Sequence, residues 1–289
     1  MTRHPLFGVL LAMAGALVLT PDTLLMRWSG MGGFAMLAWR GLLMGSVMIL
    51  LWPLTGRSGW SQLPMLARPA GIGVILCHAT NATFFALGIA VAPVPIVLLT
   101  VATVPVFAAL FGRVLLGERT SAATWITMAA VLAGIAIAVT GRDAEGGAGH
   151  PLLGAAAGFG VAAAMALNFV LLRRNRQVPI QPAMGLGALL AGLVGLSLAG
   201  LPAMGDGAVW AIAVTGAVIL PMSFLSLSIA ARHTSATNVS LLLLLETVLG
   251  PVWVWLGADE PLTGAMILGG AIVVGALALY LLREGRRRV

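Results

Sequence analysis

The stretch HPLFGVLLAMAGALVLTPDTLLMR at residues 4–27 has a second copy, HPLLGAAAGFGVAAAMALNFVLLR, at residues 150–173. The leading histidine, proline and leucine, the following glycine and the final arginine recur in the same order and without a gap. Both stretches are mostly apolar, and each reaches the about 20 residues that a helix needs to cross a bilayer core. The repeat predicts two related halves, residues 1–145 and 146–289, that each begin with a membrane-spanning helix.

The composition is that of a membrane protein. Of the 289 residues, 60% are hydrophobic and 9% are charged, whereas a soluble domain carries about 25% charged residues. This leaves too little polar surface to cover a water-soluble globule of this size. With a single cysteine, the chain also lacks a disulfide framework. The composition therefore excludes an ordinary cytosolic enzyme, a disordered chain and a disulfide scaffold.

The chain contains further apolar runs of membrane-spanning length. Ten can be marked, at roughly residues 6–27, 33–54, 69–92, 95–116, 121–140, 151–172, 181–201, 208–231, 235–256 and 262–282. The runs are continuously apolar and do not alternate in the manner of barrel strands, which favours helices. The sequence therefore predicts an all-α integral membrane protein with ten transmembrane helices.

The positive charges, all arginine, predict the orientation of the chain. If the N-terminus lies in the cytoplasm, ten spans return the C-terminus to the same side, and the outer segments hold only Arg27 and Arg142. The cytoplasmic segments then hold Arg3, Arg57, Arg68, Arg119, Arg173, Arg174, Arg176, Arg232, Arg283, Arg286, Arg287 and Arg288. This bias follows the positive-inside rule and predicts that both termini are cytoplasmic. Because the arginines lie between apolar runs, they indicate topology, and no nucleic-acid partner is expected.

Each half holds five runs, an odd number, so the second half is expected to enter the membrane from the opposite side. In the last three runs of each half, a shift of 142 residues superposes the hydropathy and carries Val106 onto Val248 and Glu118 onto Glu260. Two inverted five-helix repeats enclose a shared site, and exchange of their tilts exposes that site to alternate sides. The repeat therefore predicts a transporter; duplication without transport is the alternative.

Two motifs resemble those of EamA-type transporters in the drug/metabolite transporter superfamily. Residues 105–121, PVFAALFGRVLLGERTS, match a proline-led fourth span that ends in a Gly-Glu turn. Residues 246–263, ETVLGPVWVWLGADEPLT, repeat this pattern with Thr247 in the place of Pro105 and a proline displaced to Pro251. Arg40 resembles an arginine that the family often carries in its second span. The resemblance implies a ten-helix fold and export of small solutes, amino acids being the best-known example, across a bacterial inner membrane.

Two charged residues fall inside the first two runs at matching depths. Asp22 lies five residues before Arg27, and Arg40 lies seven residues into the second run, which places them about 8 Å and about 10 Å below the outer edge. We expect them to approach each other, because a charge inside the bilayer requires a partner or a use. Either the pair only joins the two helices, or Arg40 also holds a substrate carboxylate in its planar fork.

Glu246 lies in the middle of the ninth run, with no cation close to it in sequence. A carboxyl group in apolar surroundings can exchange a proton during transport, as a proton-coupled exporter requires. The sequence therefore proposes Glu246 as a coupling or substrate-binding residue. The alternatives are a permanently protonated group bonded to a neighbouring helix, and an ion pair with Arg40.

Further polar residues are candidates for substrate contact. His78 and Asn81 lie three residues apart in the third run and share a helix face with Phe85. Thr103 lies on a similar face of the fourth run. These side chains offer hydrogen bonds and a ring to a small solute; the alternative is hydrogen bonding between helices, a common use of polar residues in membranes.

Several chemistries are absent from the sequence. There is no lysine and hence no phosphate-binding loop ending in one, no zinc-protease or serine-hydrolase motif, and no Cys/His cluster. The sequence therefore predicts no enzyme activity, no cofactor and no bound metal. The expected partners are a small-molecule substrate, membrane lipid and protons, with the chain acting as a monomer or homodimer.

Three alternative functions stay open at this point. The first is a multidrug or cation exporter of the same superfamily, in which Glu246 would be the counter-charge of the cation and Arg40 would be structural. The other two are an intramembrane enzyme and a non-transporting scaffold. Transport of an unchanged solute separates the transporters from the last two.

Overall fold

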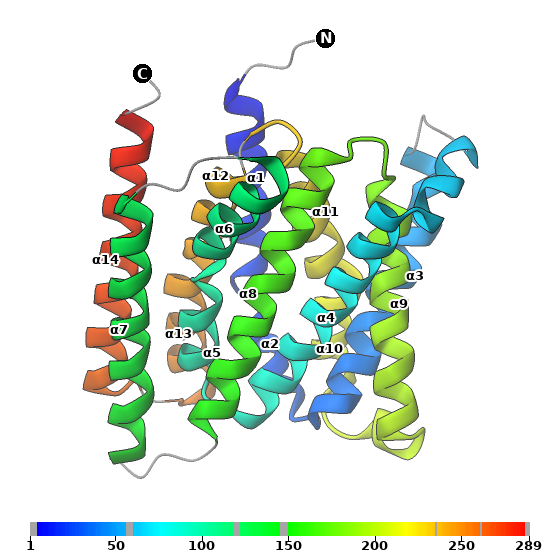
Figure 1. Cartoon of the computed structure of the whole chain (residues 1–289). Coiled ribbons are helices and arrows are strands. Elements are labelled where there is room, and N and C mark those ends of the chain that lie inside the picture. The colour runs from blue at the N-terminus through cyan, green and yellow to red at the C-terminus, as the bar shows by residue number, and fades with distance from the viewer. Residues whose placement is uncertain are drawn as a thin grey trace.

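The computed structural model describes residues 5–55, 60–117, 122–144, 150–234, 236–260 and 262–286, and these residues form helices and no strand (Figure 1). The helices of the first half are α1 (Pro5–Leu19), α2 (Asp22–Ser29), α3 (Gly33–Thr55), η1 (Trp60–Ala67), α4 (Pro69–Val91), α5 (Val94–Val101), α6 (Val104–Leu116) and α7 (Ala122–Ala144). Those of the second half are α8 (Pro151–Arg174), α9 (Ile180–Ala199), η2 (Pro202–Gly205), α10 (Val209–Val214), η3 (Thr215–Ile219), α11 (Leu220–Ala230), α12 (Ala236–Leu242), α13 (Leu244–Ala258) and α14 (Gly264–Arg286). Glu118 and the arginines at 3, 57, 119, 287 and 288 lie outside the described residues.

Within the described residues, seven helical segments are long and apolar enough to cross a membrane. They are Phe7–Ser29, Gly33–Leu54, Pro69–Val91, Val94–Leu116, Pro151–Arg174, Ile180–Ala199 and Val209–Ala230. Three shorter apolar helices, Trp125–Ala138, Leu244–Ala258 and Gly264–Ala276, occupy the predicted fifth, ninth and tenth runs. Large apolar side chains such as Leu50, Leu152 and Leu193 are exposed on the outer surfaces of the helices, as contact with lipid requires. An all-helical, multi-pass membrane fold is therefore confirmed.

Three of the predicted continuous spans are broken at or near a proline. The first divides at Pro21 into α1 and α2, and the fourth divides just before Pro105 into α5 and α6. Just before Pro221 the eighth span widens into the π-helical turn η3. Proline has no N–H to donate, and its ring clashes with the preceding turn, so each position interrupts the helical ladder. By contrast α13 continues through Pro251.

The two halves pack against each other along most of their length. α3 lies along α9, α7 along α14, α4 along α8 and α1 along α11. Figure 1 shows α7 and α14 at one edge of the molecule and α3 and α9 at the other. In the same view α1 begins at the upper end and α8 at the lower end. The interior that these contacts enclose is therefore built from both halves.

Close contact between α3 and α9 depends on glycines. A Cβ added to Gly192 would lie 2.5 Å from the backbone nitrogen of Leu42, and one added to Gly41 would lie 2.5 Å from the carbonyl oxygen of Ala188. Neither backbone atom can move aside without separating the helices. Small residues permit such close helix contact in membranes, where packing drives helix association.

We expect Gly192→Val to destabilise the protein by about 1–3 kcal/mol, because the added side chain forces α3 and α9 apart. The midpoint of thermal unfolding in detergent measures this loss. The matched control is Gly275→Val on α14, since a Cβ there meets no atom within 4 Å. Equal midpoints for the two variants would contradict the packing argument.

Candidate functional site

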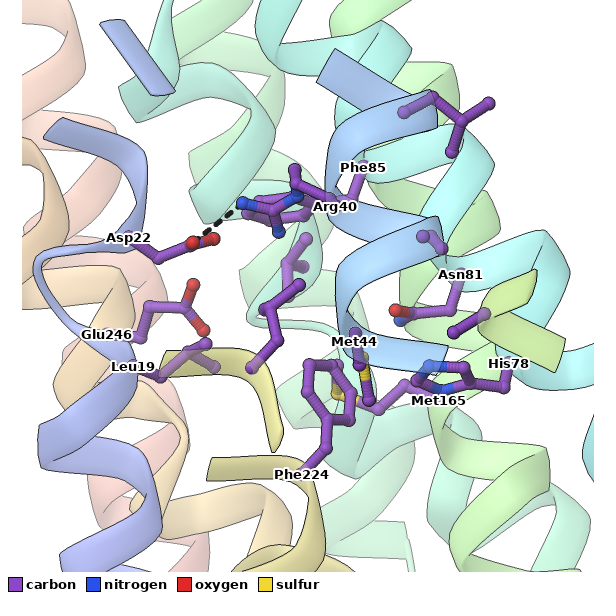
Figure 2. A pocket seen from close by; sticks show the side chains of 16 residues that line it. Leu19, Asp22, Arg40, Met44, His78, Asn81, Phe85, Met165, Phe224 and Glu246 are labelled. Carbon is purple, nitrogen blue, oxygen red and sulfur yellow. Dashed lines mark hydrogen bonds and ion pairs between the residues drawn. The ribbon is translucent and has the colours of Figure 1, made fainter. Parts of the chain in front are cut away.

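A buried ion pair joins the first two helical spans. Asp22 is the first residue of α2, where the break at Pro21 directs it inward, and Arg40 lies on α3. Arg40 Nη1 donates to Asp22 Oδ1 over 2.6 Å, and both residues are buried (Figure 2). The guanidinium carbon of Arg40 also lies 5.5 Å from the ring centre of Phe85 on α4, within the range of a cation–π contact. The approach of Asp22 and Arg40 that the sequence predicts is therefore present.

The ion pair borders a narrow internal cavity of ≈ 30 Å³. Six of the seven residues proposed from the sequence line it: Asp22, Arg40, His78, Asn81, Phe85 and Glu246. The remaining lining is mostly apolar and comes from both halves: Leu19, Leu37, Gly41, Met44, Ala82, Val101, Met165, Ala188, Leu220 and Phe224. This volume holds about one water molecule. A solute larger than water would therefore require the cavity to widen.

Glu246 brings a second carboxyl group to the same cavity. It lies in the first turn of α13 and is buried, and Figure 2 shows it on the same side of Arg40 as Asp22. Among the described residues, neither its Oε1 nor the Oδ2 of Asp22 has a hydrogen-bond partner. Leaving a buried polar atom unpaired costs about 1–3 kcal/mol. Two unpaired acceptors beside one cation indicate a site built to receive a hydrogen-bond donor.

His78 and Asn81 carry the polar part of the cavity contributed by α4. In the part of the chain that the structure describes, neither ring nitrogen of His78 nor Nδ2 of Asn81 has a partner. The His78 ring packs edge-on against Phe224, with 5.2 Å between the ring centres. In the view of Figure 2, Phe224 and Met44 lie between these two residues and Glu246. The cavity thus has a charged side, an apolar middle and an uncharged polar side.

Thr103 is the one proposed residue that the structure does not bring to this cavity. Its side chain is buried, and its Oγ1 donates to the carbonyl oxygen of Thr100 over 2.6 Å. The same carbonyl oxygen also accepts a hydrogen bond from the backbone N–H of Thr103 over 3.0 Å, in the turn between α5 and α6. A local hydrogen bond thus occupies the hydroxyl that was expected to face a solute.

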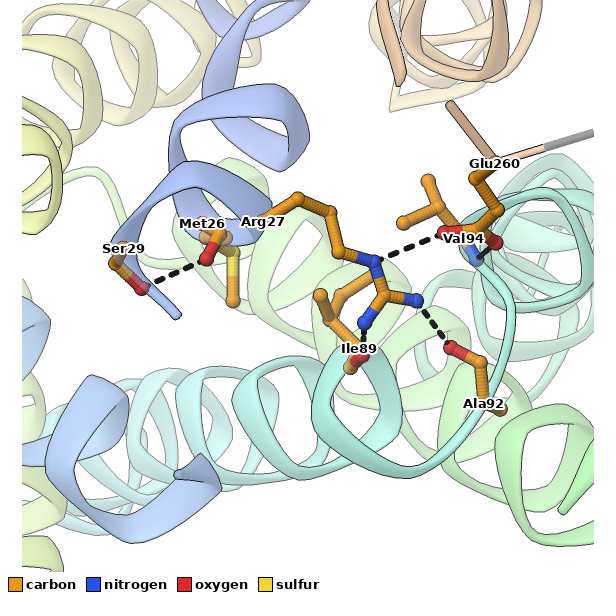
Figure 3. A network of polar contacts seen from close by, with 7 residues as sticks. All are labelled: Met26, Arg27, Ser29, Ile89, Ala92, Val94 and Glu260. Carbon is orange, nitrogen blue, oxygen red and sulfur yellow. Dashed lines mark hydrogen bonds and ion pairs between the residues drawn. The ribbon is translucent and has the colours of Figure 1, made fainter. Parts of the chain in front are cut away.

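A second polar network, which the sequence did not predict, joins the two halves away from the cavity (Figure 3). Arg27 Nε donates to Glu260 Oε2 over 2.9 Å, and its two terminal nitrogens donate to the carbonyl oxygens of Ile89 and Ala92, each over 2.7 Å. The N–H of Val94 donates to the other oxygen of Glu260 over 2.8 Å. These bonds satisfy carbonyls at the end of α4 and an N–H at the start of α5. One ion pair therefore fastens α2, α4 and α5 to the loop before α14.

The sequence contained a signal for the residues of the Arg27 network, but none for the apolar residues that line the cavity. Arg27 and Glu260 both belong to the repeat, and Arg27 was expected on the outer side. The bonds of Arg27, however, go mainly to backbone atoms, which no residue pattern reveals. Phe224 and the cavity methionines are apolar residues among many other apolar residues of their helices. Their sequence contains no mark of the side that faces inward.

Comparison with known proteins finds a similar family for the first half of the chain. Residues 6–140 match the EamA-like transporter family, whereas no curated protein is similar enough in sequence to match the chain. One solved structure, described only as the crystal structure of a protein, superposes with a TM-score of 0.67 at 20% sequence identity. The superposition covers 95% of this chain and 97% of that one, and at such identity it shows the fold alone. The resemblance seen in the sequence is thus confirmed over residues 6–140, which are similar to the EamA-like transporter family.

Proposed function

We propose that this protein is a secondary transporter with ten membrane spans. It exports small amphipathic metabolites, above all amino acids, by alternating access. The observation that carries the proposal is the buried Asp22–Arg40 pair beside Glu246 Oε1, which has no hydrogen-bond partner among the described residues. The protein would lie in a bacterial inner membrane with both termini in the cytoplasm, as a monomer or homodimer.

The helix contacts support two inverted repeats. If α1 corresponds to α8, α3 to α9, α4 to α11 and α7 to α14, then the contacts α3–α9 and α7–α14 each join equivalent helices. The other two contacts are equivalent to each other: replacing α4 by α11 and α8 by α1 turns the contact α4–α8 into the contact α1–α11. A pseudo-two-fold axis in the membrane plane would produce this pattern, because it reverses one half relative to the other.

The charges of the cavity suit a zwitterion that carries a carboxylate and an ammonium group. The fork of Arg40 keeps donors beyond the one used by Asp22, and a guanidinium binds carboxylates with two parallel hydrogen bonds. Asp22 Oδ2 and Glu246 Oε1 would then accept hydrogen bonds from the ammonium group of the same solute. An amino acid would satisfy these two unpaired acceptors and, as a zwitterion, would add no net charge to the cavity.

The contacts of Arg27 support a conformation closed at its end of the molecule. Arg27 bonds residues of the first half and Glu260 of the second, so opening this end would require these bonds to break. The repeat places Arg173 and Glu118 at the corresponding positions of the other half, and Glu118 lies outside the described residues. Breaking the Arg27 contacts is thus a step of the proposed transport cycle.

The direct test is uptake of labelled amino acids into proteoliposomes that contain the purified full-length chain. Uptake of the unchanged solute above that of empty liposomes is expected, together with competition by unlabelled solute. Chemical conversion of the solute would instead indicate an intramembrane enzyme. Absence of uptake for amino acids, other metabolites and cationic dyes would contradict transport.

A second candidate, export of cationic drugs, is favoured by one observation. Glu246 Oε1 is a buried acceptor without a described partner in a cavity with an apolar, aromatic middle, and such a cavity fits an aromatic cation. In this case uptake of a cationic dye would depend on Glu246 and tolerate neutralisation of Arg40. For an amino acid, uptake would depend on Arg40.

We expect Arg27→Gln to open the end of the molecule at which Glu260 lies, because it removes the ion pair and the two bonds to backbone carbonyls. For the measurement, the cavity residue Ala82 is replaced by cysteine in a protein that also carries Cys77→Ala. An impermeant maleimide is added on the side at which Glu260 lies, and the rate at which it labels the new cysteine is recorded. Labelling should rise by about tenfold or more, since each lost charge-assisted bond is worth about 1.5–3 kcal/mol.

The matched control for this experiment is Asp259→Asn. This substitution removes a neighbouring negative charge, and among the described residues the Asp259 side chain makes no hydrogen bond or ion pair. The control should label at the rate of the parent protein. If Arg27→Gln labels no faster than the control, the Arg27 contacts do not hold this end closed.

A further inference from the structure

A second cavity lies at the end of the molecule where α8 ends and α4 begins. Its volume is ≈ 460 Å³, and its described lining includes Arg68, Arg173, Arg174 and Arg176 but no carboxylate. In Figure 1 the start of α4 and the end of α8 both lie toward the upper end, where α1 also begins. The cavity is therefore distinct from the central one, and it lies where the candidate membrane span Pro69–Val91 begins and the candidate span Pro151–Arg174 ends.

Two of these arginines are held in place by backbone carbonyls of other elements. Arg174 Nη1 donates to the carbonyl oxygen of Leu115 at the end of α6 over 2.9 Å. Arg176 Nη2 donates to the carbonyl oxygen of Arg232 after α11 over 3.0 Å. Each bond uses one of the five N–H donors of a guanidinium and leaves the others for a ligand. The contacts fix the side chains beside the cavity without neutralising their charge.

Two further features add positive potential here. The Arg232 guanidinium lies beside the cavity, because its Nη2 donates to the carbonyl oxygen of the lining residue Val178; burial, and then the charge of Arg176, lower its pKa. α4 begins beside the cavity, and its N-terminus has no side-chain cap. The first N–H groups of a helix and its dipole both attract anions.

We propose that this cavity binds a phosphate group, carried either by the headgroup of an anionic phospholipid or by free phosphate in solution. Arginine suits phosphate because its planar fork matches two phosphate oxygens at once. Basic pockets between transmembrane helices near the membrane surface are suited to anionic headgroups. This proposal does not depend on which solute the protein transports, because the phosphate group would bind to the second cavity and its binding can be measured without any transport.

The test measures binding by the full chain in two arms. In the first, nanodiscs containing phosphatidylglycerol or only phosphatidylcholine are compared by native mass spectrometry for lipid retained by the protein. In the second, inorganic phosphate is titrated against the protein in phosphatidylcholine nanodiscs, and the shift in thermal midpoint is recorded. Arg68→Gln and Arg176→Gln are compared with Arg113→Gln, which removes one exposed arginine of α6 outside the described cavity lining.

We expect Arg68→Gln and Arg176→Gln each to weaken binding by about tenfold or more, and Arg113→Gln to leave it near the parent value. Loss confined to phosphatidylglycerol identifies the lipid headgroup as the source of the phosphate group. Loss of the phosphate-induced shift identifies free phosphate. An equal effect of all three substitutions would show only a general attraction to positive charge and would overturn the proposal. Absence of binding in both arms would overturn it as well.

Discussion

Replacing Arg40 with methionine should reduce uptake of carboxylate-bearing solutes by about 100-fold or more, because the proposed anchor of the carboxylate is lost. The same change should lower stability by about 3–5 kcal/mol, since it leaves the buried Asp22 carboxylate without its cation. Proteoliposome uptake measures the first effect, and thermal unfolding in detergent measures the second. Uptake is normalised to the amount of folded protein, which keeps the two effects apart.

The double variant Asp22→Asn/Arg40→Met separates substrate binding from a purely structural role. It removes both charges, so most of the lost stability should return, because no unpaired ion remains buried. Transport should not return, because the guanidinium is still absent. Recovery of uptake together with stability would mean that Arg40 only joins α2 to α3.

Replacing Glu246 with glutamine should abolish the acceleration of transport by a pH gradient while preserving exchange of solute at equal pH. Glutamine keeps the shape of the side chain and can still accept a hydrogen bond, but it cannot release a proton. The measurement compares proteoliposome uptake with and without an imposed pH gradient. We expect the gradient-driven increase of the parent protein to fall to the level seen without a gradient.

Asp259→Asn is the control for this substitution, because Asp259 is exposed and its positive φ of 51° is one that asparagine also adopts. It should transport as the parent does. Retention of the gradient effect in Glu246→Gln would contradict a coupling role. Loss of both gradient-driven uptake and exchange, in a stably folded variant, would make Glu246 a substrate-binding residue instead.

The fold was largely predictable from composition and run length. A helix satisfies its own backbone hydrogen bonds in lipid, so a continuous apolar run has few structural alternatives there. The breaks were only partly predictable: Pro21 and Pro105 accompany interruptions, but α13 continues through Pro251, and α12 separates from α13 at Leu243 without a proline. The course of the backbone there depends on neighbouring helices.

The candidate site was predictable to a similar extent, for a related reason. A charged or polar group in an apolar run is costly, so Asp22, Arg40 and Glu246 could be identified individually without knowledge of their neighbours. Their depth along the helices also predicted that Asp22 and Arg40 would meet. Thr103 shows the limit of this argument, because its hydroxyl donates to a carbonyl three residues earlier in the chain and then needs no partner in the cavity.

The sequence by itself determined that this chain is a multi-pass helical membrane protein, where its helices run, and which buried charges need a partner. These properties depend on the transfer of each residue into lipid, which is local to the chain. Only the tertiary structure decided that Asp22, Arg40, His78, Asn81, Phe85 and Glu246 share one cavity, that Arg27 fastens the two halves, and that arginines surround a second cavity. Such contacts depend on the rotation of each helix about its axis, and a uniformly apolar helix does not encode that rotation in its hydrophobicity.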